Sequence, residues 1–309
     1  MLWENLGNIR SATNFCVQEE LNAEVARFSY ALLPLYFDSS YYADFEKLCE
    51  PAYRVAHLLD DYKLKRRVYG LDGARAAIIK DKPRCIEIWN KRIKICQAAG
   101  DIEGVADTLI DLSWEYAELG QLDVAKDHLD RGLELARSIQ NQNLAATCLV
   151  QIARQAFERG ETEVGLETLR QAEAEIDYAT GKQLIPFVLQ YSALLYQQYG
   201  FDEDAWRFAQ SLLAMTLEGH RYQQVSWSLA CLGELSEKAE NFEFAAFCLL
   251  TATKLNREFT TKYEPRVRTG TARLQKSHPE IMTRLIAEHR KTPWLSMVKT
   301  ILKESSSRT

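Results

Sequence analysis

The side chains that most often do chemistry in proteins are spread thinly along this chain. Its histidines are His57, His128, His220, His278 and His289, and no two have the H-x-x-x-H spacing of a zinc-binding helix. No glycine-rich segment precedes Lys-Ser or Lys-Thr, as a phosphate-binding loop requires. No G-x-S-x-G elbow of a serine hydrolase occurs either. The sequence therefore predicts no catalytic residue, no metal ligand and no cofactor, and we expect a protein that is not an enzyme.

The cysteines are also unlike a reactive or metal-binding set. There are seven, an odd number, and no two form a C-x-x-C pair. Most lie inside apolar helical patterns, so we expect buried free thiols that act as small hydrophobic side chains. The N-terminal segment carries charges where a signal peptide needs an apolar stretch. No apolar run reaches the roughly 18 residues of a membrane span, so we predict a cytoplasmic protein without a membrane partner.

The charge balance limits the choice of partners. The chain has 309 residues, with 38 Lys and Arg against 43 Asp and Glu, and a net charge of −5. This mild acidity argues against broad binding to nucleic acid, which depends on neutralising phosphates. The segment from Tyr263 onward is basic, so an acidic body carries a basic end that could orient an acidic partner.

The helices that must position the remaining polar side chains follow one period. Apolar residues recur at three- and four-residue spacing, which is typical of amphipathic helices, and alternation of period two is scarce. Gly and Pro are few, 14 and 7, and short polar breaks come at regular intervals. Equivalent turns recur at one constant interval, at Ser40, Lys80, Gly120, Gly160, Gly200 and Glu240. A fixed period of this length indicates stacked helix pairs.

Small residues repeat in the same register on both sides of each turn. Two antiparallel helices approach closely only where their side chains are small, so these positions predict the helix crossings. The first helices offer Gly73, Ser113, Ala153, Ala193 and Gly233, and the second helices offer Cys85, Ala125, Gly165, Ala205 and Ala245. Large residues one helical turn later, Leu129, Leu169 and Leu249, are expected to fill the space against the next repeat.

At these residues the sequence resembles the tetratricopeptide repeat, or TPR. The matching residues are Leu112, Ser113, Tyr116, Gly120, Ala125, Leu129 and Gly132, with Leu232, Gly233 and Ala245 in the last full repeat. The usual repeat has about 34 residues, so these longer repeats have extended helices. The resemblance implies an all-α, right-handed superhelical solenoid of antiparallel helix pairs. We expect a capping helix over 1–21, six TPR-like repeats over 22–260, and a helical cap with a flexible basic end over 261–309.

A second resemblance concerns the two ends of the chain. The opening Asn8-Ile9-Arg10 and the closing helices after Arg273-Leu274 resemble the borders of the helical sensor domain in STAND-type signalling ATPases, including LuxR-type regulators. The resemblance implies a sensor arm of a signalling or transcription regulator, here without the ATPase part. Its ligand would be a small molecule or a short peptide. An adjacent ATPase or DNA-binding reading frame in the genome would support this alternative.

The function that the repeats favour is binding of a protein or peptide in the concave groove. In TPR folds the first helix of each pair lines that groove. Aromatic, amide and arginine side chains occupy the corresponding positions here, and such groups bind peptide backbones and carboxylates. The predicted groove residues are Arg67, Asp111, Trp114, Gln151, Arg154, Gln190, Tyr191 and Trp227. Since Arg154 is the one cation at the positions that TPR co-chaperones use, a clamp for a C-terminal carboxylate is not expected.

Overall fold

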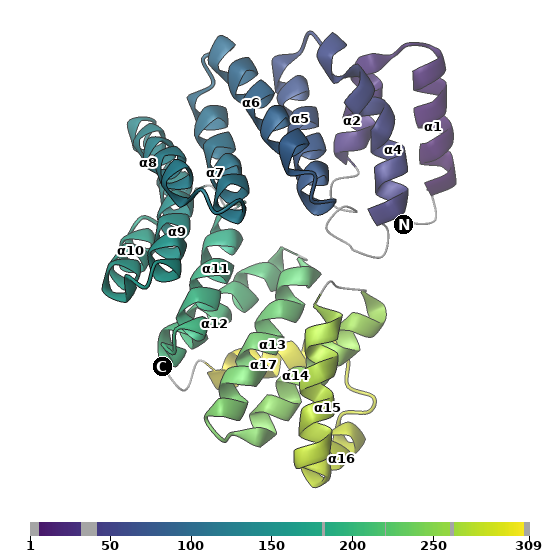
Figure 1. Ribbon diagram of the computed structural model, residues 1–309. Helices are drawn as coiled ribbons and strands as arrows, with labels where there is room; N and C mark the ends of the chain where they lie inside the picture. Colours follow the sequence, from purple (N-terminus) through teal and green to yellow (C-terminus); the bar gives the residue numbers. More distant parts are fainter. Residues whose placement is uncertain (1–5, 32–41, 181–182, 220, 260–262, 306–309) are drawn as a thin grey trace. The chain divides into compact units, whose positions relative to one another are not determined.

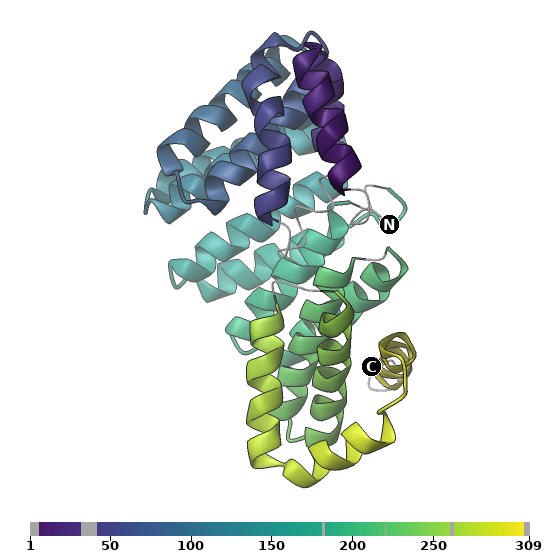
Figure 2. The ribbon, with the colours of Figure 1, turned by 90° about the vertical axis from the view of Figure 1, so that its right-hand side faces the viewer.

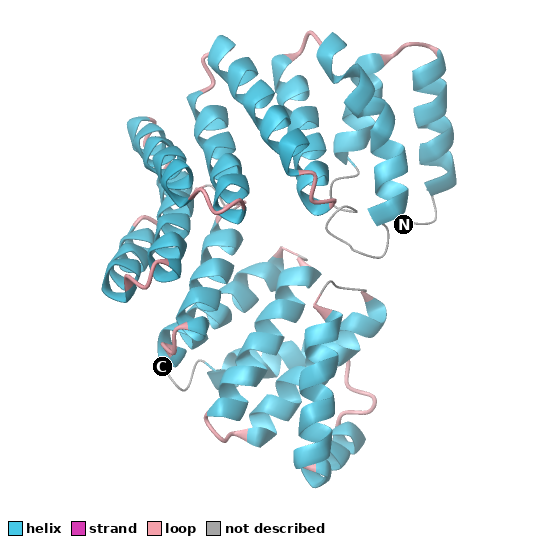
Figure 3. Cartoon of the chain, in the orientation of Figure 1, coloured by secondary structure: helices cyan, strands magenta, loops and turns pink. Residues whose placement is uncertain are grey.

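The computed structural model describes residues 6–31, 42–180, 183–219, 221–259 and 263–305. These residues form α-helices, one short 3-10 helix and no strand (Figure 3). The predicted turn at Ser40 lies outside them. The chain divides into two compact units, one up to Thr180 and the other from Gly181. Within each unit, consecutive helices pack against each other in pairs (Figure 1), which confirms the predicted all-α, TPR-like fold.

The helices of unit 1 repeat with great regularity. They are α1 (Leu6–Gln18), α2 (Asn22–Ala31), α4 (Tyr42–Val55), the 3-10 helix η3 (Ala56–Leu58), α5 (Tyr62–Ile78), α6 (Lys82–Ala98), α7 (Ile102–Glu118), α8 (Leu122–Ser138), α9 (Gln142–Glu158) and α10 (Thr162–Ala174). From α5 to α9 every helix has 17 residues. Their first residues are evenly spaced along the chain.

Unit 2 continues the pattern and then departs from it. Its helices are α11 (Ile185–Gln198), α12 (Asp202–Glu218), α13 (Tyr222–Lys238), α14 (Phe242–Glu258), α15 (Glu264–Ser277), α16 (Pro279–Glu288) and α17 (Trp294–Ser305). The last helix does not extend the row of pairs. It folds back and packs against α12 and α14.

The turns explain the regular length of the helices. At Gly120 the backbone has φ of 75°, a left-handed conformation that suits glycine. The Gln121 N–H then donates to the Tyr116 carbonyl at 2.9 Å, and the Gly120 N–H donates to the Ala117 carbonyl. This pair of bonds is a Schellman motif, which ends a helix. Left-handed residues recur at the same phase, at Glu20, Lys80, Gly100, Gly120, Gln140, Gly160, Gly200 and Glu240.

The residue after several of these left-handed positions starts the next helix. Asp81, Asp101, Asn141 and Asn241 each accept a hydrogen bond from a backbone N–H of the first turn. Such an N-cap stabilises a helix by about 1 kcal/mol. The breaks seen in the sequence are therefore a stop signal followed at once by a start signal.

The predicted helix crossings are buried, as expected. Ser113, Ala125, Ala153, Ala193, Ala205 and Ala245 are all fully covered. At Gly73 a Cβ atom would lie 2.5 Å from the Trp89 ring, so only glycine fits against that indole. Leu129, Leu169 and Leu249 fill the core beside the crossings. All seven cysteines are buried and free, and burial raises the pKa of the Cys148 thiol to about 12.

Candidate functional site

The first helices of consecutive pairs meet in unit 1. Trp114 of α7 and Arg154 of α9 occupy the same position in adjacent repeats. The Arg154 guanidinium carbon lies 3.7 Å from the centroid of the Trp114 ring. A cation this close to an indole face is held by the ring's quadrupole. The structure thus brings together two of the predicted groove residues. We call the surface formed by Asp107, Asp111, Trp114, Arg154 and Glu158 the first-helix face.

Arg154 is shielded but still reaches solvent. Its side chain is 14 % exposed, and its Nη1 lies 3.5 Å from Glu158 Oε1, one turn further along α9. Stacking covers a face of the guanidinium, so hydrogen bonds to it must come at its edge. Nη1 is the part of that edge that a carboxylate can reach, because Nε and Nη2 are buried. The arrangement therefore holds a cationic group in a fixed orientation.

A second arginine organises the neighbouring part of the same face. Arg92 of α6 donates to Asp107 at 2.7 Å and to Asp111 at 3.1 Å. Its side chain is 10 % exposed, whereas the two carboxylates are much more open to solvent. Although the Asp111 side chain is 38 % exposed, partial desolvation of its carboxyl group and the Asp107 carboxylate raise its pKa above the ordinary value, against the opposing effect of Arg92. Predicted as a ligand contact, Asp111 is thus also part of an ion pair between two helices.

The raised pKa gives a pH dependence with a definite sign. Between the ordinary pKa of an aspartate and the raised one, folded Asp111 holds a proton that the unfolded chain has released. Stability must therefore fall as pH rises through this window. Relative to an Asp111→Asn variant, the wild-type melting temperature should decline between about pH 4 and about pH 7. The expected difference is at most about 1 kcal/mol, because solvent screens a partly exposed pair.

Thermal melts of both proteins at several pH values test this prediction. Asp130→Asn is the matched control, since Asp130 forms an exposed pair with Lys126 on α8. A wild-type curve that rises relative to Asp111→Asn would show that Arg92 dominates and that the pKa is lowered instead.

The other two predicted residues of unit 1 lie in contrasting environments. Arg67 of α5 is exposed. Gln151 of α9 is fully buried. Within the described ranges, neither polar atom of the Gln151 amide has a hydrogen-bond partner. Contact of Gln151 with a ligand stays a prediction, and its burial makes Arg154 and Trp114 the more accessible candidates.

In unit 2, two of the three predicted groove residues contact α15 or the residue just before it. Gln190 donates to the Tyr263 hydroxyl at 2.7 Å. The Trp227 ring is 3 % exposed, and the Arg266 guanidinium lies 5.4 Å from its centroid. Tyr191 packs its ring on Phe187, with centroids 4.3 Å apart. Tyr263 before α15 and Arg266 in its first turn therefore contact two of the residues that the sequence predicted for a ligand.

Arg266 also completes a polar cluster that sequence reasoning did not assemble. Its Nε donates to Glu234 at 2.8 Å and its Nη2 donates to Gln197 at 3.2 Å. Gln197 in turn donates to Glu234 at 3.0 Å. Gln197 and Glu234 lie on first helices at positions that line the predicted groove, so the repeat register in the sequence already indicated them. Arg266 follows Glu234 at a separation that does not match the repeat register, and no spacing pointed to it.

Two general properties of the described part of the chain bear on function. No group of three or more His, Cys, Asp or Glu side chains there is arranged to hold a metal ion. None of the helices in the described ranges combines the length and apolar character needed to cross a membrane.

Comparison with known proteins gives the fold. BtubC (BKLC) from P. vanneervenii is 16 % identical over 82 % of this chain and 91 % of its own, with a TM-score of 0.50. The apo form of RapI is 13 % identical over 99 % of this chain and 95 % of its own, with a TM-score of 0.49. TPR-like repeats of a putative kinesin light chain from Podosopora anserina are 14 % identical over 62 % of this chain and 94 % of their own, with a TM-score of 0.46.

At these identities the likeness to BtubC shows a shared helical-repeat fold and nothing finer. No family model matches the chain, and no curated protein matches it. The chain is thus a TPR-like helical repeat protein by fold. The resemblance of its ends to STAND-type sensor domains is not among these findings and stays a prediction.

Proposed function

We propose that this chain is a non-enzymatic scaffold that binds a protein or peptide partner through the first-helix face of unit 1. The observation that carries the proposal is the stack of Arg154 on Trp114. It places a large aromatic surface and an oriented cation together, on adjacent repeats of a helical array. Trp and Arg are the side chains most often found at the energetic centre of interfaces.

The partner's chemistry follows from the neighbours of Arg154. Glu158 lies beside the guanidinium at 3.5 Å, in an i,i+4 pair that is 40 % exposed on the acid side. Such a pair contributes little to stability, so a partner carboxylate can take the place of Glu158 at small cost. We therefore expect a peptide segment with an acidic residue beside an apolar one, the acid at Arg154 and the apolar group on Trp114.

Selection of binders to the full chain from a random peptide library displayed on phage tests the proposal. Selected peptides should share an acidic and an apolar residue. Their affinity should fall at least tenfold, or about 1.4 kcal/mol, in Arg154→Ala and in Trp114→Ala, with little change in melting temperature. Arg154→Lys keeps the charge but loses the planar stack, so it should recover only part of the affinity.

Arg170→Ala is the matched control. Arg170 lies on α10, its side chain is 69 % exposed, and it pairs with Glu167 one helical turn away, much as Arg154 pairs with Glu158. Its removal should leave affinity unchanged. Equal affinities in wild type, Arg154→Ala and Trp114→Ala, all well folded, would contradict binding at this face.

A further inference from the structure

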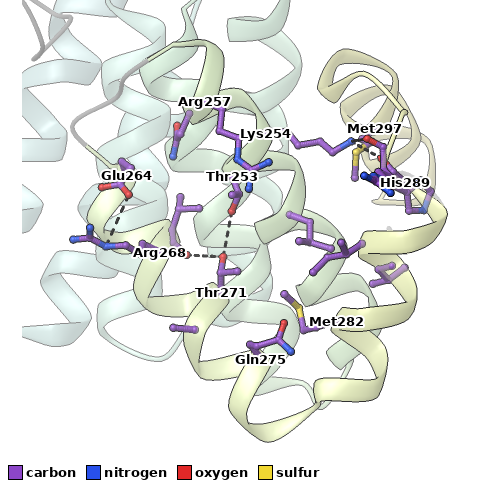
Figure 4. A pocket seen from close by; sticks show the side chains of 17 residues that line it. Thr253, Lys254, Arg257, Glu264, Arg268, Thr271, Gln275, Met282, His289 and Met297 are labelled. Atoms are coloured by element: carbon purple, nitrogen blue, oxygen red, sulfur yellow. Dashed lines mark hydrogen bonds and ion pairs between the residues drawn. The ribbon is translucent and has the colours of Figure 1, made fainter.

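Unit 2 contains a cavity near its C-terminal helices. Its volume is about 570 Å³, within the range of pockets that hold small organic ligands. The lining residues come from α14, α15 and α16, with His289 and Arg290 from the segment after α16 and Met297 from α17 (Figure 4).

The cavity exists because the last helix pair departs from the regular turn. The earlier turns within pairs use a left-handed residue between two helices. Here His278 alone separates α15 from α16, and Pro279 begins the new helix. Figure 2 shows the yellow α16 leaving the lower end of the yellow-green α15 at a steep angle instead of running along it. The faces of α14 and α15 that a regular partner helix would cover are left to line the hollow.

The tail holds this shape with its own contacts. The Lys254 ammonium donates to the carbonyls of His289 and Thr292, the latter at 2.6 Å, where α16 has ended. The Trp294 indole N–H donates to Glu258 at 2.8 Å. These bonds fix the course of the chain from α16 into α17, so the hollow is a built feature of the fold.

The floor of the cavity is apolar. Val267, Met282, Leu285 and Met297 line it, and each is at most 4 % exposed. Two of the four are methionines, whose unbranched, polarisable side chains adapt to irregular apolar partners. Leu250 and Ile286 also line the cavity and are more exposed, so an alkyl chain can contact apolar surface there.

The rim of the cavity is cationic. Arg257, Arg268 and Arg290 line it and are exposed. Among the described lining residues Glu264 is the one acid, and it lies 3.9 Å from Arg268. Positive side chains therefore outnumber negative ones around the opening. An apolar floor under an unbalanced positive rim is complementary to a ligand with an apolar body and one negative group.

We propose that this cavity binds a small amphipathic carboxylate, with its alkyl chain on the apolar lining and its carboxylate at Arg257 on the cationic rim. Arginine pairs with carboxylates through charge-assisted hydrogen bonds, and the alkyl chain gains by leaving water. This site is separate from the first-helix face, and its existence does not depend on the peptide-binding function.

Calorimetric titration of the full chain with sodium decanoate, below its micelle concentration, tests the proposal. Decanoate should bind saturably with one site per chain. Decanol, which has the chain without the charge, should bind at least tenfold more weakly. Acetate, which has the charge without the chain, should show no binding.

Substitutions of residues that line the cavity test whether decanoate binds inside it. Ile286 lines the cavity and is 46 % exposed, so Ile286→Trp can fill the hollow without overpacking the core. It should weaken decanoate binding at least tenfold. Arg257→Ala should weaken it three- to tenfold and leave decanol unaffected. Lys276→Ala, an exposed cation of α15 that does not line the cavity, is the control and should bind like wild type.

Several outcomes would overturn this assignment. They are non-saturable uptake of decanoate, equal affinity for decanoate and decanol, or undiminished binding in a well-folded Ile286→Trp variant. Tighter binding of a short peptide ending in leucine than of decanoate, lost in the same variants, would assign the cavity to a polypeptide terminus instead.

Discussion

Replacing Lys82 with methionine should lower the free energy of unfolding by about 3 kcal/mol. The Lys82 ammonium at the start of α6 lies 2.7 Å from Glu115 Oε2 and also contacts Glu118, both on α7. The Glu115 side chain is 5 % exposed and that of Lys82 is 19 % exposed. Methionine keeps the apolar stem but leaves the buried Glu115 charge without its cation, which is costly in a poorly solvated place.

Urea denaturation of the wild type and three variants measures this effect. Lys91→Met is the matched control on the same helix, because Lys91 and Glu87 form a pair that is more than half exposed. Its expected cost is under about 1 kcal/mol. Lys82→Met/Glu115→Met removes both charges and should recover most of the lost stability. If Lys82→Met cost no more than Lys91→Met, the Glu115 site would be well solvated and the buried pair would not stabilise unit 1.

Leu129→Ala should lower the free energy of unfolding by about 2–5 kcal/mol. Leu129 of α8 is fully buried, one helical turn after the crossing residue Ala125. Its removal leaves a cavity that the surrounding helices can fill only in part, because their spacing is fixed by small residues at the crossings. The cost combines lost burial of a large apolar side chain with the cavity that remains.

The control for this prediction is Leu119→Ala, at the end of α7. Leu119 is 46 % exposed, and its truncation should change stability by less than about 0.5 kcal/mol. Leu169→Ala tests the repeat itself, because Leu169 occupies the same position in the next repeat and is also fully buried. A large cost at Leu129 together with none at Leu169 would show that equivalent positions do not share the same packing.

The regular part of the fold was predictable because local chemistry repeats there. A left-handed turn favours glycine, as at Gly120, and a close helix crossing favours a small residue, as at Ala125. A helix start favours a capping side chain, as at Asp101, so the residue type alone indicates each feature. The same rules failed after Ala174, where α10 ends early. There the Asn143 side chain bonds to the backbone of Asp177 and Thr180. That contact joins residues far apart in sequence, and no periodic pattern encodes it.

The candidate site was predictable in part for the same reason. The sequence predicted Trp114 and Arg154 as groove residues because they hold equivalent positions on first helices, and their contact with a partner stays a prediction. Arg92 was missed because it reaches the first-helix face from a second helix, at sequence separations from its two aspartates that fit no repeat. The contact of Tyr263 with Gln190 depends on where α15 packs, which is a tertiary property.

The phase of the turns also bears on how such a chain can change length during evolution. From α5 to α9 both the turns and the crossing residues return at constant intervals. If one whole repeat is lost or duplicated between equivalent turns, the next helix still packs with the same face and in the same register against its neighbour. A single insertion inside a helix turns everything after it by about 100°, which brings apolar side chains into water. Genes for this stretch should therefore grow and shrink by whole repeats.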